Sequence, residues 1–229
     1  MIVMRHFYFF SSAVLLASCS GESNDISADV DSTQTTTNRL PFLGFHDVQY
    51  IEKNGIQVAD TLYHTVPDFA LVNQNNALVT GDDVKGKIHV VNFFFTHCPA
   101  ICPAMIKQMQ RMQENTKDVE ELIFLSHTID PERDSLPRLN EYISERNIDT
   151  SNWHFLWGER EEVYLLGQEG YMINAMEDEY ADGGFLHSEH FVLVDREGHV
   201  RGLYEGTIPA RVDQMEKDIR RLITEEYGN

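Results

Sequence analysis

An apolar run that leads into two cysteines is the feature that most constrains this chain. Val90–Phe95 is short, aromatic and β-branched, which is typical of a strand buried on both faces. Cys98 and Cys102 follow, and prolines 99 and 103 indicate a helix start, because proline is tolerated only at or before the first helical turn. The stretch predicts a buried strand, a reactive loop and a helix. Both cysteines then lie near a helix N-terminus, which favours thiolate over thiol.

Strand and helix patterns alternate along the rest of the chain. The cysteine helix is predicted to run to about Thr116, and Leu122–Ile129 predicts the next strand. A strand, a helix and a strand in this order imply parallel pairing with a right-handed crossover. The other predicted segments are helices at Leu136–Arg146 and Arg160–Gln168, strands at Trp153–Trp157, Phe191–Asp195 and Val200–Tyr204, a glycine-bearing loop at Tyr180–His187 and a last helix that opens at Pro209.

Two hairpins are predicted before the buried strand. The first joins Val48–Ile51 to Ile56–Val58 through an Asn-Gly pair, which supplies the positive φ angles of a tight turn. The second joins Pro67–Val72 to Ala77–Val79. These elements predict an α/β, thioredoxin-like fold, in which a central mixed sheet is flanked by helices and the first hairpin is an N-terminal accessory.

The N-terminus has the pattern of a secretory signal. Residues 1–18 combine Arg5 with an apolar stretch that is too short to span a membrane as a mature helix. The stretch ends in Leu-Ala-Ser before Cys19, which resembles the bacterial lipobox and predicts a lipidated Cys19; a plain signal peptide with an incidental cysteine is the alternative. We expect residues 19–39 to be a disordered tether, 40–64 the accessory hairpin and 65–229 the thioredoxin-like domain. A lipid anchor would place the chain in the bacterial cell envelope, on the extracytoplasmic side.

Charge and cysteine content narrow the classes of function. The formal net charge is −19, and no cluster of Lys and Arg is present that would bind nucleic-acid phosphates. The chain has three cysteines, so a lipidated Cys19 leaves two for chemistry. Cys98 and Cys102 can form a structural disulfide, exchange disulfides or hold a soft metal. Positions i and i+4 of a helix have Cβ atoms about 5–6 Å apart, wider than a disulfide prefers, and a metal bridges that gap more easily.

His187 is the candidate for a third ligand. In a thioredoxin-like layout, the loop that enters the closing strand pair lies beside the cysteine helix, although an ordinary histidine at a strand edge remains the alternative. Two thiolates and an imidazole suit Cu(I), and with an open position they also suit Zn(II). We expect His97 and His190 to be structural, and the methionines of the cysteine helix to be core residues; these are Met105, Met109 and Met112.

Two aspartates follow the second parallel strand, close to where sites form in α/β sheets. Asp134 is predicted to open the helix that starts at Leu136. For Asp130, turn formation and an electrostatic role beside the metal ligands are both open.

Three motifs together resemble the Sco/SenC family. They are Phe95–Pro103 with its two cysteines, Ile129–Asp134, and His187 just before a strand. The resemblance implies a thioredoxin-like domain that binds copper, as Cu(I) and also Cu(II), through Cys98, Cys102 and His187. It further implies delivery of copper to the dinuclear centre of cytochrome c oxidase subunit II or to another copper-accepting protein. Asp130 matches the family's acidic motif.

The chain departs from the family pattern at two positions. Ala100 stands where an acidic residue is common, and Leu186 stands where an aspartate often precedes the histidine.

From the three motifs together, the leading interpretation is a membrane-tethered metallochaperone rather than an enzyme. One alternative is a thiol–disulfide oxidoreductase that keeps acceptor cysteines reduced, with Cys98 and Cys102 as its redox-active pair. Another is a copper or redox sensor with the same site.

Overall fold

The computed structural model describes residues 39–99, 101–173, 175–177 and 185–228. The predicted signal segment, Cys19 and all but the last residue of the predicted tether lie outside this part of the chain. None of the helices formed by the described residues is long and apolar enough to cross a membrane.

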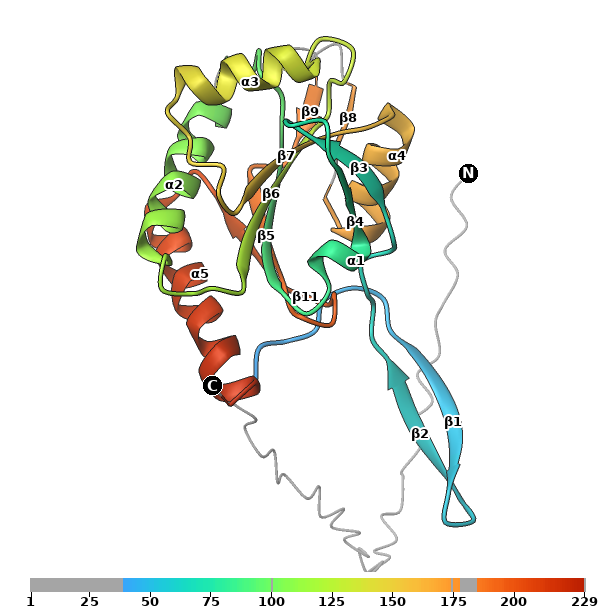
Figure 1. Ribbon diagram of the computed structural model, residues 1–229. Helices are drawn as coiled ribbons and strands as arrows, with labels where there is room; N and C mark the ends of the chain where they lie inside the picture. The colour runs from blue at the N-terminus through green and yellow to red at the C-terminus, as the bar shows by residue number, and fades with distance from the viewer. Residues whose placement is uncertain (1–38, 100, 174, 178–184, 229) are drawn as a thin grey trace, which may run out of the picture. The chain divides into compact units, whose positions relative to one another are not determined.

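A mixed sheet is built around β5 (Ile88–Phe94), every residue of which is buried (Figure 1). The two strands that follow it, β6 (Leu122–Thr128) and β7 (Trp153–Trp157), are parallel to it and confirm the predicted parallel pairing. The predicted thioredoxin-like sheet is thereby confirmed. In order across the sheet, the described strands are β11 (Val200–Glu205), β10 (His190–Val194), β5, β6, β7, β3 (Ala70–Asn73) and β4 (Leu78–Thr80).

Helices cover both faces of this sheet, which is why β5 is buried on both sides. α2 (Ile101–Asn115) and α5 (Pro209–Arg221) lie on one side, and α4 (Arg160–Leu165) lies on the other (Figure 1). The ring of Phe94 packs 5.5 Å from that of Tyr142 in α3 (Leu136–Glu145). The ring of Phe93, on the opposite face, packs 5.9 Å from that of Tyr171, just after α4 and its π-helical continuation η1 (Leu166–Gly170).

The apolar stripe of the cysteine helix faces the core, as predicted. Met105, Met109 and Met112 are each 0% exposed, so they are core residues. At the other end of the chain α5 also buries its apolar face and continues into the π-helical turn η3 (Leu222–Glu226). α2 and α5 are joined at their surfaces by Arg111 Nη1 and Asp213 Oδ1, 2.5 Å apart.

Both predicted hairpins are present. β1 (Asp47–Lys53) and β2 (Ile56–Leu62) form the accessory hairpin, and its turn residues Asn54 and Gly55 both have positive φ, at 54° and 78°. Its side chains are exposed or half-buried throughout. β3 pairs with β4 in the second hairpin, and a short helix, α1 (Gly81–Val84), connects it to β5.

One predicted loop is partly wrong. The glycine-bearing segment was expected to be a loop through His187, but its last residues form a strand, β9 (Phe185–His187), that pairs antiparallel with β8 (Ala175–Glu177). Because its partner strand β8 lies about ten residues earlier in the chain, the residues of β9 alone give no pattern that predicts the pairing. Residues 178–184 lie outside the described part.

Candidate metal-binding site

Cys98 lies in a tight turn at the carboxyl end of β5. Its backbone N–H donates to the carbonyl of Phe95 at 3.2 Å, and the chain enters α2 three residues later. The buried strand fixes where this turn begins, and Pro99 cannot extend a strand ladder because it lacks an N–H. The turn therefore presents the first cysteine at the N-terminus of the helix that carries the second.

The two cysteines are neighbours in space. The backbone N–H of Cys102 donates to Cys98 Sγ at 3.4 Å, so the sulfur accepts one of the N–H groups that a helix start leaves without an intrahelical partner. Both side chains are thiols, and they are buried, with 8% of Cys98 and 1% of Cys102 exposed. Two sulfurs held at one helix start, away from water, can bind a soft metal ion or exchange disulfides.

The expected acidity is wrong for Cys102. The hydrogen bond with Cys98 and burial both raise the pKa of the Cys102 thiol. The helix N-terminus does favour negative charge, but the N–H group at this position is directed at Cys98 Sγ rather than at the Cys102 side chain. Without a metal ion, Cys102 therefore keeps its proton at neutral pH.

Asp134 ties together the ends of the two central parallel strands. Its carboxylate accepts hydrogen bonds from the Thr96 N–H at 3.0 Å, the Thr96 hydroxyl at 2.5 Å and the Thr128 hydroxyl at 2.6 Å. The carboxylate is fully buried, and Ser135 is the residue at the N-cap of α3. The prediction that Asp134 opens this helix is therefore wrong. The residue instead anchors the backbone two positions before Cys98.

Sequence reasoning missed this bond because its partners are 38 and 6 residues away in the chain. One signal was available. Thr96 follows β5 and Asp134 follows β6, and the carboxyl ends of adjacent parallel strands meet at one edge of a sheet.

Asp130 closes the turn that carries Asp134. Its backbone carbonyl accepts the N–H of Asp134 at 2.9 Å, and its buried carboxylate forms an ion pair with Arg133. The turn-forming role proposed for Asp130 is therefore present. Among the described residues, hydrogen bonds link Asp130 to the cysteine loop through Asp134.

His187 ends β9, three residues before β10 begins at His190. β10 runs antiparallel to β5, with Val192 opposite Val91 and Val194 opposite His89. The start of β10 is therefore at the same end of the sheet as the end of β5, where the cysteine turn begins. The His187 side chain lies outside the described part of the structure.

The other two histidines near the site have nearby hydrogen-bond partners. His190 Nδ1 is 2.7 Å from the Ser188 hydroxyl oxygen. His97 Nδ1 is 3.0 Å from the Thr96 hydroxyl oxygen, and half of the His97 side chain (51%) is exposed. His97 is thus the solvent-facing imidazole next to the two buried thiols.

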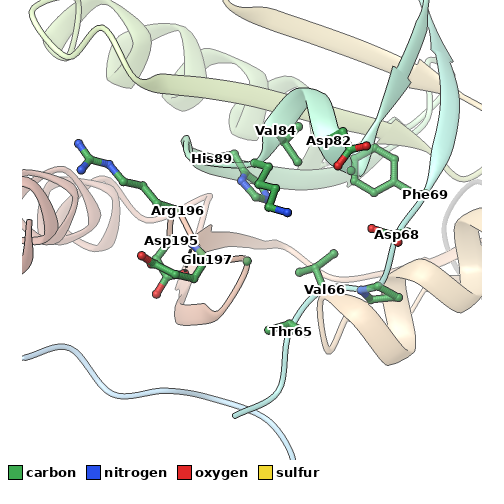
Figure 2. Close-up of a pocket in the computed structure, with 14 residues that line it drawn as sticks. Thr65, Val66, Asp68, Phe69, Asp82, Val84, His89, Asp195, Arg196 and Glu197 are labelled. Atoms are coloured by element: carbon green, nitrogen blue, oxygen red, sulfur yellow. Dashed lines mark hydrogen bonds between the residues drawn. The ribbon is translucent and has the colours of Figure 1, made fainter. Parts of the chain in front are cut away.

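A cavity of about 230 Å³ lies at the opposite end of β5. Figure 2 shows its charged side chains, with Asp68 and Asp82 on one side and Asp195 and Glu197 on the other. The imidazole of His89 lines its wall and is 2% exposed, and burial lowers the pKa of His89 to about 4. This cavity is separated from the cysteine turn by the length of the strand.

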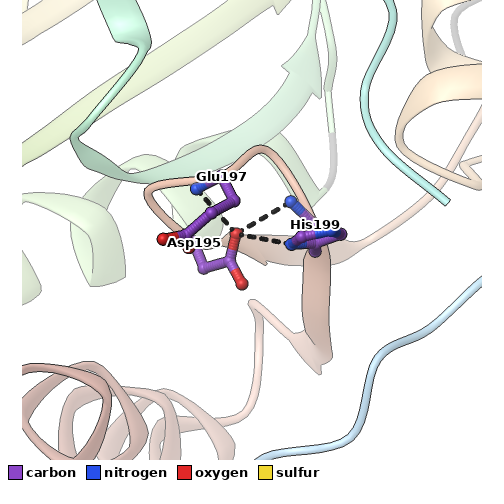
Figure 3. A group of neighbouring side chains, drawn as sticks. All are labelled: Asp195, Glu197 and His199. Carbon is purple, nitrogen blue, oxygen red and sulfur yellow. Dashed lines mark hydrogen bonds and ion pairs between the residues drawn. The ribbon is translucent and has the colours of Figure 1, made fainter. Parts of the chain in front are cut away.

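Among the described residues, Asp195, Glu197 and His199 form the one group of three or more His, Cys, Asp or Glu side chains whose spacing suits a metal ion (Figure 3). The Asp195 carboxylate is already engaged, because it accepts the backbone N–H groups of Glu197 and His199 at 3.0 and 2.9 Å. Its second oxygen accepts from Arg201 Nη1 at 2.8 Å. A cation here would have to approach a buried guanidinium, so the group is a brace for the β10–β11 turn.

The fold and the site define a class of protein: a thioredoxin-like α/β domain with two buried thiols at the start of the helix that follows its central strand. The sequence profile of the SCO1/SenC family matches residues 58–224, so the chain belongs to this family. The SCO1 protein homolog of Bacillus subtilis is 27% identical over 172 residues, which cover 74% of this chain and 89% of the relative.

Solved structures agree with this assignment. A SCO1/SenC family lipoprotein from Bacillus anthracis superposes with a TM-score of 0.65 at 28% identity, covering 70% of this chain and 95% of that one. Arabidopsis thaliana ScoI, solved with copper bound, superposes with a TM-score of 0.57 at 25% identity, covering 69% of this chain and 99% of that one.

Proposed function

We propose that this protein is a copper metallochaperone that holds Cu(I) through Cys98, Cys102 and His187 and passes it to an acceptor protein. The observation that carries the proposal is the pair of buried thiols at one helix start, with the Cys102 N–H 3.4 Å from Cys98 Sγ. Membership in the family and a copper-bound relative support copper over Zn(II). The backbone register of β10 supports His187 as the third ligand.

The acceptor we propose is the dinuclear copper centre of cytochrome c oxidase subunit II, on the basis of the family. We further propose that the chain is tethered to a bacterial membrane through a lipidated Cys19, facing the extracytoplasmic side. A relative that is a lipoprotein supports the tether. We assign Asp130 an indirect part, because its carbonyl holds the N–H of Asp134 and Asp134 holds the cysteine turn.

Anaerobic Cu(I) titration of the full chain tests this proposal. We expect one equivalent of tightly bound copper, no tight binding in Cys98→Ser or Cys102→Ser, and weaker binding in His187→Ala. His190→Ala is the matched control for the histidine, and Met109→Leu is the control for a buried sulfur outside the pair. Wild-type stoichiometry and affinity in all three ligand variants would end the proposal.

Disulfide exchange is the second candidate, and the same two thiols favour it. A redox role needs Cys98 and Cys102 but not an imidazole ligand. His187→Ala separates the two functions in a cell that needs the protein for oxidase assembly. Full rescue by this variant would favour the oxidoreductase, whereas loss of rescue would favour copper delivery.

A further inference from the structure

The two candidate thiols are buried, but copper must reach them and leave them. Only 8% of Cys98 and 1% of Cys102 are exposed, so a side chain of an acceptor protein has little access to either sulfur. His97, the residue next to Cys98, is much more accessible, because 51% of its side chain is exposed. One loop therefore carries a buried sulfur ligand and a solvent-facing imidazole at adjacent positions.

A hydrogen-bond network determines which nitrogen of His97 carries the proton. The Thr96 hydroxyl donates its single proton to Asp134 Oδ1 at 2.5 Å. It can therefore only accept from its other neighbours, which are Arg138 Nε at 3.3 Å and His97 Nδ1 at 3.0 Å. The neutral His97 ring must then hold its proton on Nδ1 and present a bare lone pair on Nε2.

This arrangement is the one that metal-binding imidazoles use. A histidine that binds a metal through one ring nitrogen usually donates the other N–H to an oxygen, which fixes the tautomer and the ring orientation. At His97 the oxygen belongs to Thr96, and Asp134 holds Thr96 by both its hydroxyl and its N–H. At His190 the Ser188 hydroxyl is 2.7 Å from Nδ1, and the same oxygen accepts the His190 backbone N–H at 3.2 Å. That pairing leaves the hydroxyl proton available to the ring, so it does not impose the His97 tautomer.

We propose that His97 is the exposed copper ligand through which Cu(I) enters and leaves the buried cysteine pair. This inference rests on the proposed copper function. In the outward step, a bond forms between copper and His97 Nε2 as the bond between copper and Cys98 Sγ breaks. Copper stays Cu(I), no electron moves, and the released Cys98 thiolate takes a proton from water, which leaves hydroxide for the solvent buffer to neutralise. Asp134 and Thr96 are positioning residues that keep the Nε2 lone pair available.

The test is the rate at which the full chain, loaded anaerobically with one Cu(I), transfers the metal to the chelator bathocuproine disulfonate. We expect His97→Ala to slow transfer about tenfold while its equilibrium affinity for copper stays within about twofold of the wild type. Thr96→Val should also slow transfer, because the ring loses its fixed acceptor, and Thr96→Ser should restore the rate. His190→Ala is the matched control and should transfer copper at the wild-type rate.

Four other outcomes would contradict either the inference about His97 or the proposed copper function. An unchanged rate in His97→Ala overturns the inference, and so does equal slowing in His190→Ala. A fall in equilibrium affinity that matches the fall in rate would make His97 a permanent ligand, which also contradicts it. A wild-type chain that takes up no copper would refute the proposed function itself. Circular dichroism of each variant shows whether the domain remains folded.

Discussion

Two buried aspartates, one at each end of the central sheet, are held in opposite ways. Asp195 is 1% exposed and is paired with Arg201, whose guanidinium is equally buried and also donates to the carbonyls of Leu40 and Pro41. Asp134 is 0% exposed, and its hydrogen bonds come from uncharged donors, the Thr96 and Thr128 hydroxyls and one backbone N–H. The same side chain thus forms a direct ion pair with arginine at one end, whereas at the other end its hydrogen bonds come from hydroxyls and one backbone N–H, and the nearest arginine, Arg138, reaches it only through Thr96.

The two aspartates therefore have different roles: Asp195 stabilises the fold, whereas Asp134 also acts on the candidate site. At the Asp195 end, the charge of the carboxylate is balanced by the Arg201 guanidinium, and the pair fixes the β10–β11 turn and the backbone at Leu40 and Pro41. At the Asp134 end the negative charge acts on the cysteines: after the Cys98 hydrogen bond and burial, it further raises the pKa of the Cys102 thiol. A negative carboxylate near two thiols favours an incoming cation such as Cu(I). The candidate site is therefore at the end where the buried carboxylate has no direct arginine partner among its hydrogen bonds.

The largest expected effect is at the ion pair. Asp195→Ala leaves Arg201 as a buried charge without its carboxylate, so we expect a loss of about 3–5 kcal/mol in the free energy of unfolding. Urea unfolding measures this. Asp213→Ala is the control, because its partner Arg111 and Asp213 are 37% and 49% exposed. That exposed pair should contribute no more than about 1 kcal/mol. Equal losses in the two variants would remove the distinction between them.

A smaller loss of stability, with a change in thiol chemistry, is expected for Asp134→Asn. The amide cannot accept all three donors, which should cost about 1–3 kcal/mol. Removing the negative charge should also lower the pKa of Cys102, so iodoacetamide should alkylate the metal-free protein at lower pH. Mass spectrometry at a series of pH values follows the reaction. If Asp195→Ala shifts this pH profile equally, Asp134 has no special link to the thiols.

The smallest expected effect is on acid stability, through a buried imidazole near each end of the sheet. Burial lowers the pKa of His89 to about 4 and that of His127 to about 3. Below pH 6.5 these two histidines bind protons in the unfolded chain but not in the folded protein, so the free energy of unfolding falls as the pH falls. Each histidine should cost about 0.8 kcal/mol at pH 6 relative to alkaline pH, with the loss growing until the folded pKa is reached.

His127→Phe isolates one of these contributions. The His127 ring stacks on that of Phe93 with centroids 5.0 Å apart, so phenylalanine keeps the shape and removes the titrating group. Urea unfolding at pH 7.5 and pH 6 should show a smaller difference in this variant than in the wild type. An unchanged difference would mean that His127 does not contribute to the acid sensitivity.

Much of the fold was predictable from local pattern. The mainly apolar runs of β5 and β6 indicated a parallel sheet covered on both faces, and the spacing of Met105, Met109 and Met112 indicated the buried side of α2. The Asn-Gly pair predicted a turn whose residues do have positive φ. These predictions succeeded because strand, helix and turn preferences depend mainly on residues close together in the chain.

The predictions that failed depend on distant partners. Asp134 was expected to open a helix, but its carboxylate is bound to Thr96, 38 residues earlier. β9 falls in the glycine-bearing segment that was predicted to be a loop, and it is a strand because it pairs with β8. The acidity of Cys102 depends on burial and on the direction of one N–H group, and the Cys-x-x-x-Cys spacing predicts neither of them.

The sequence by itself determined that a buried strand leads into two cysteines at a helix start, because apolar runs, proline and helical periodicity are local properties. It also carried the motifs that resemble the family to which the chain belongs. Only the tertiary structure decided that both thiols are buried, that Asp134 anchors their loop and that the His97 ring faces solvent. Burial and hydrogen bonding depend on which distant groups meet, and the packing of β5, β6 and α2 settles that.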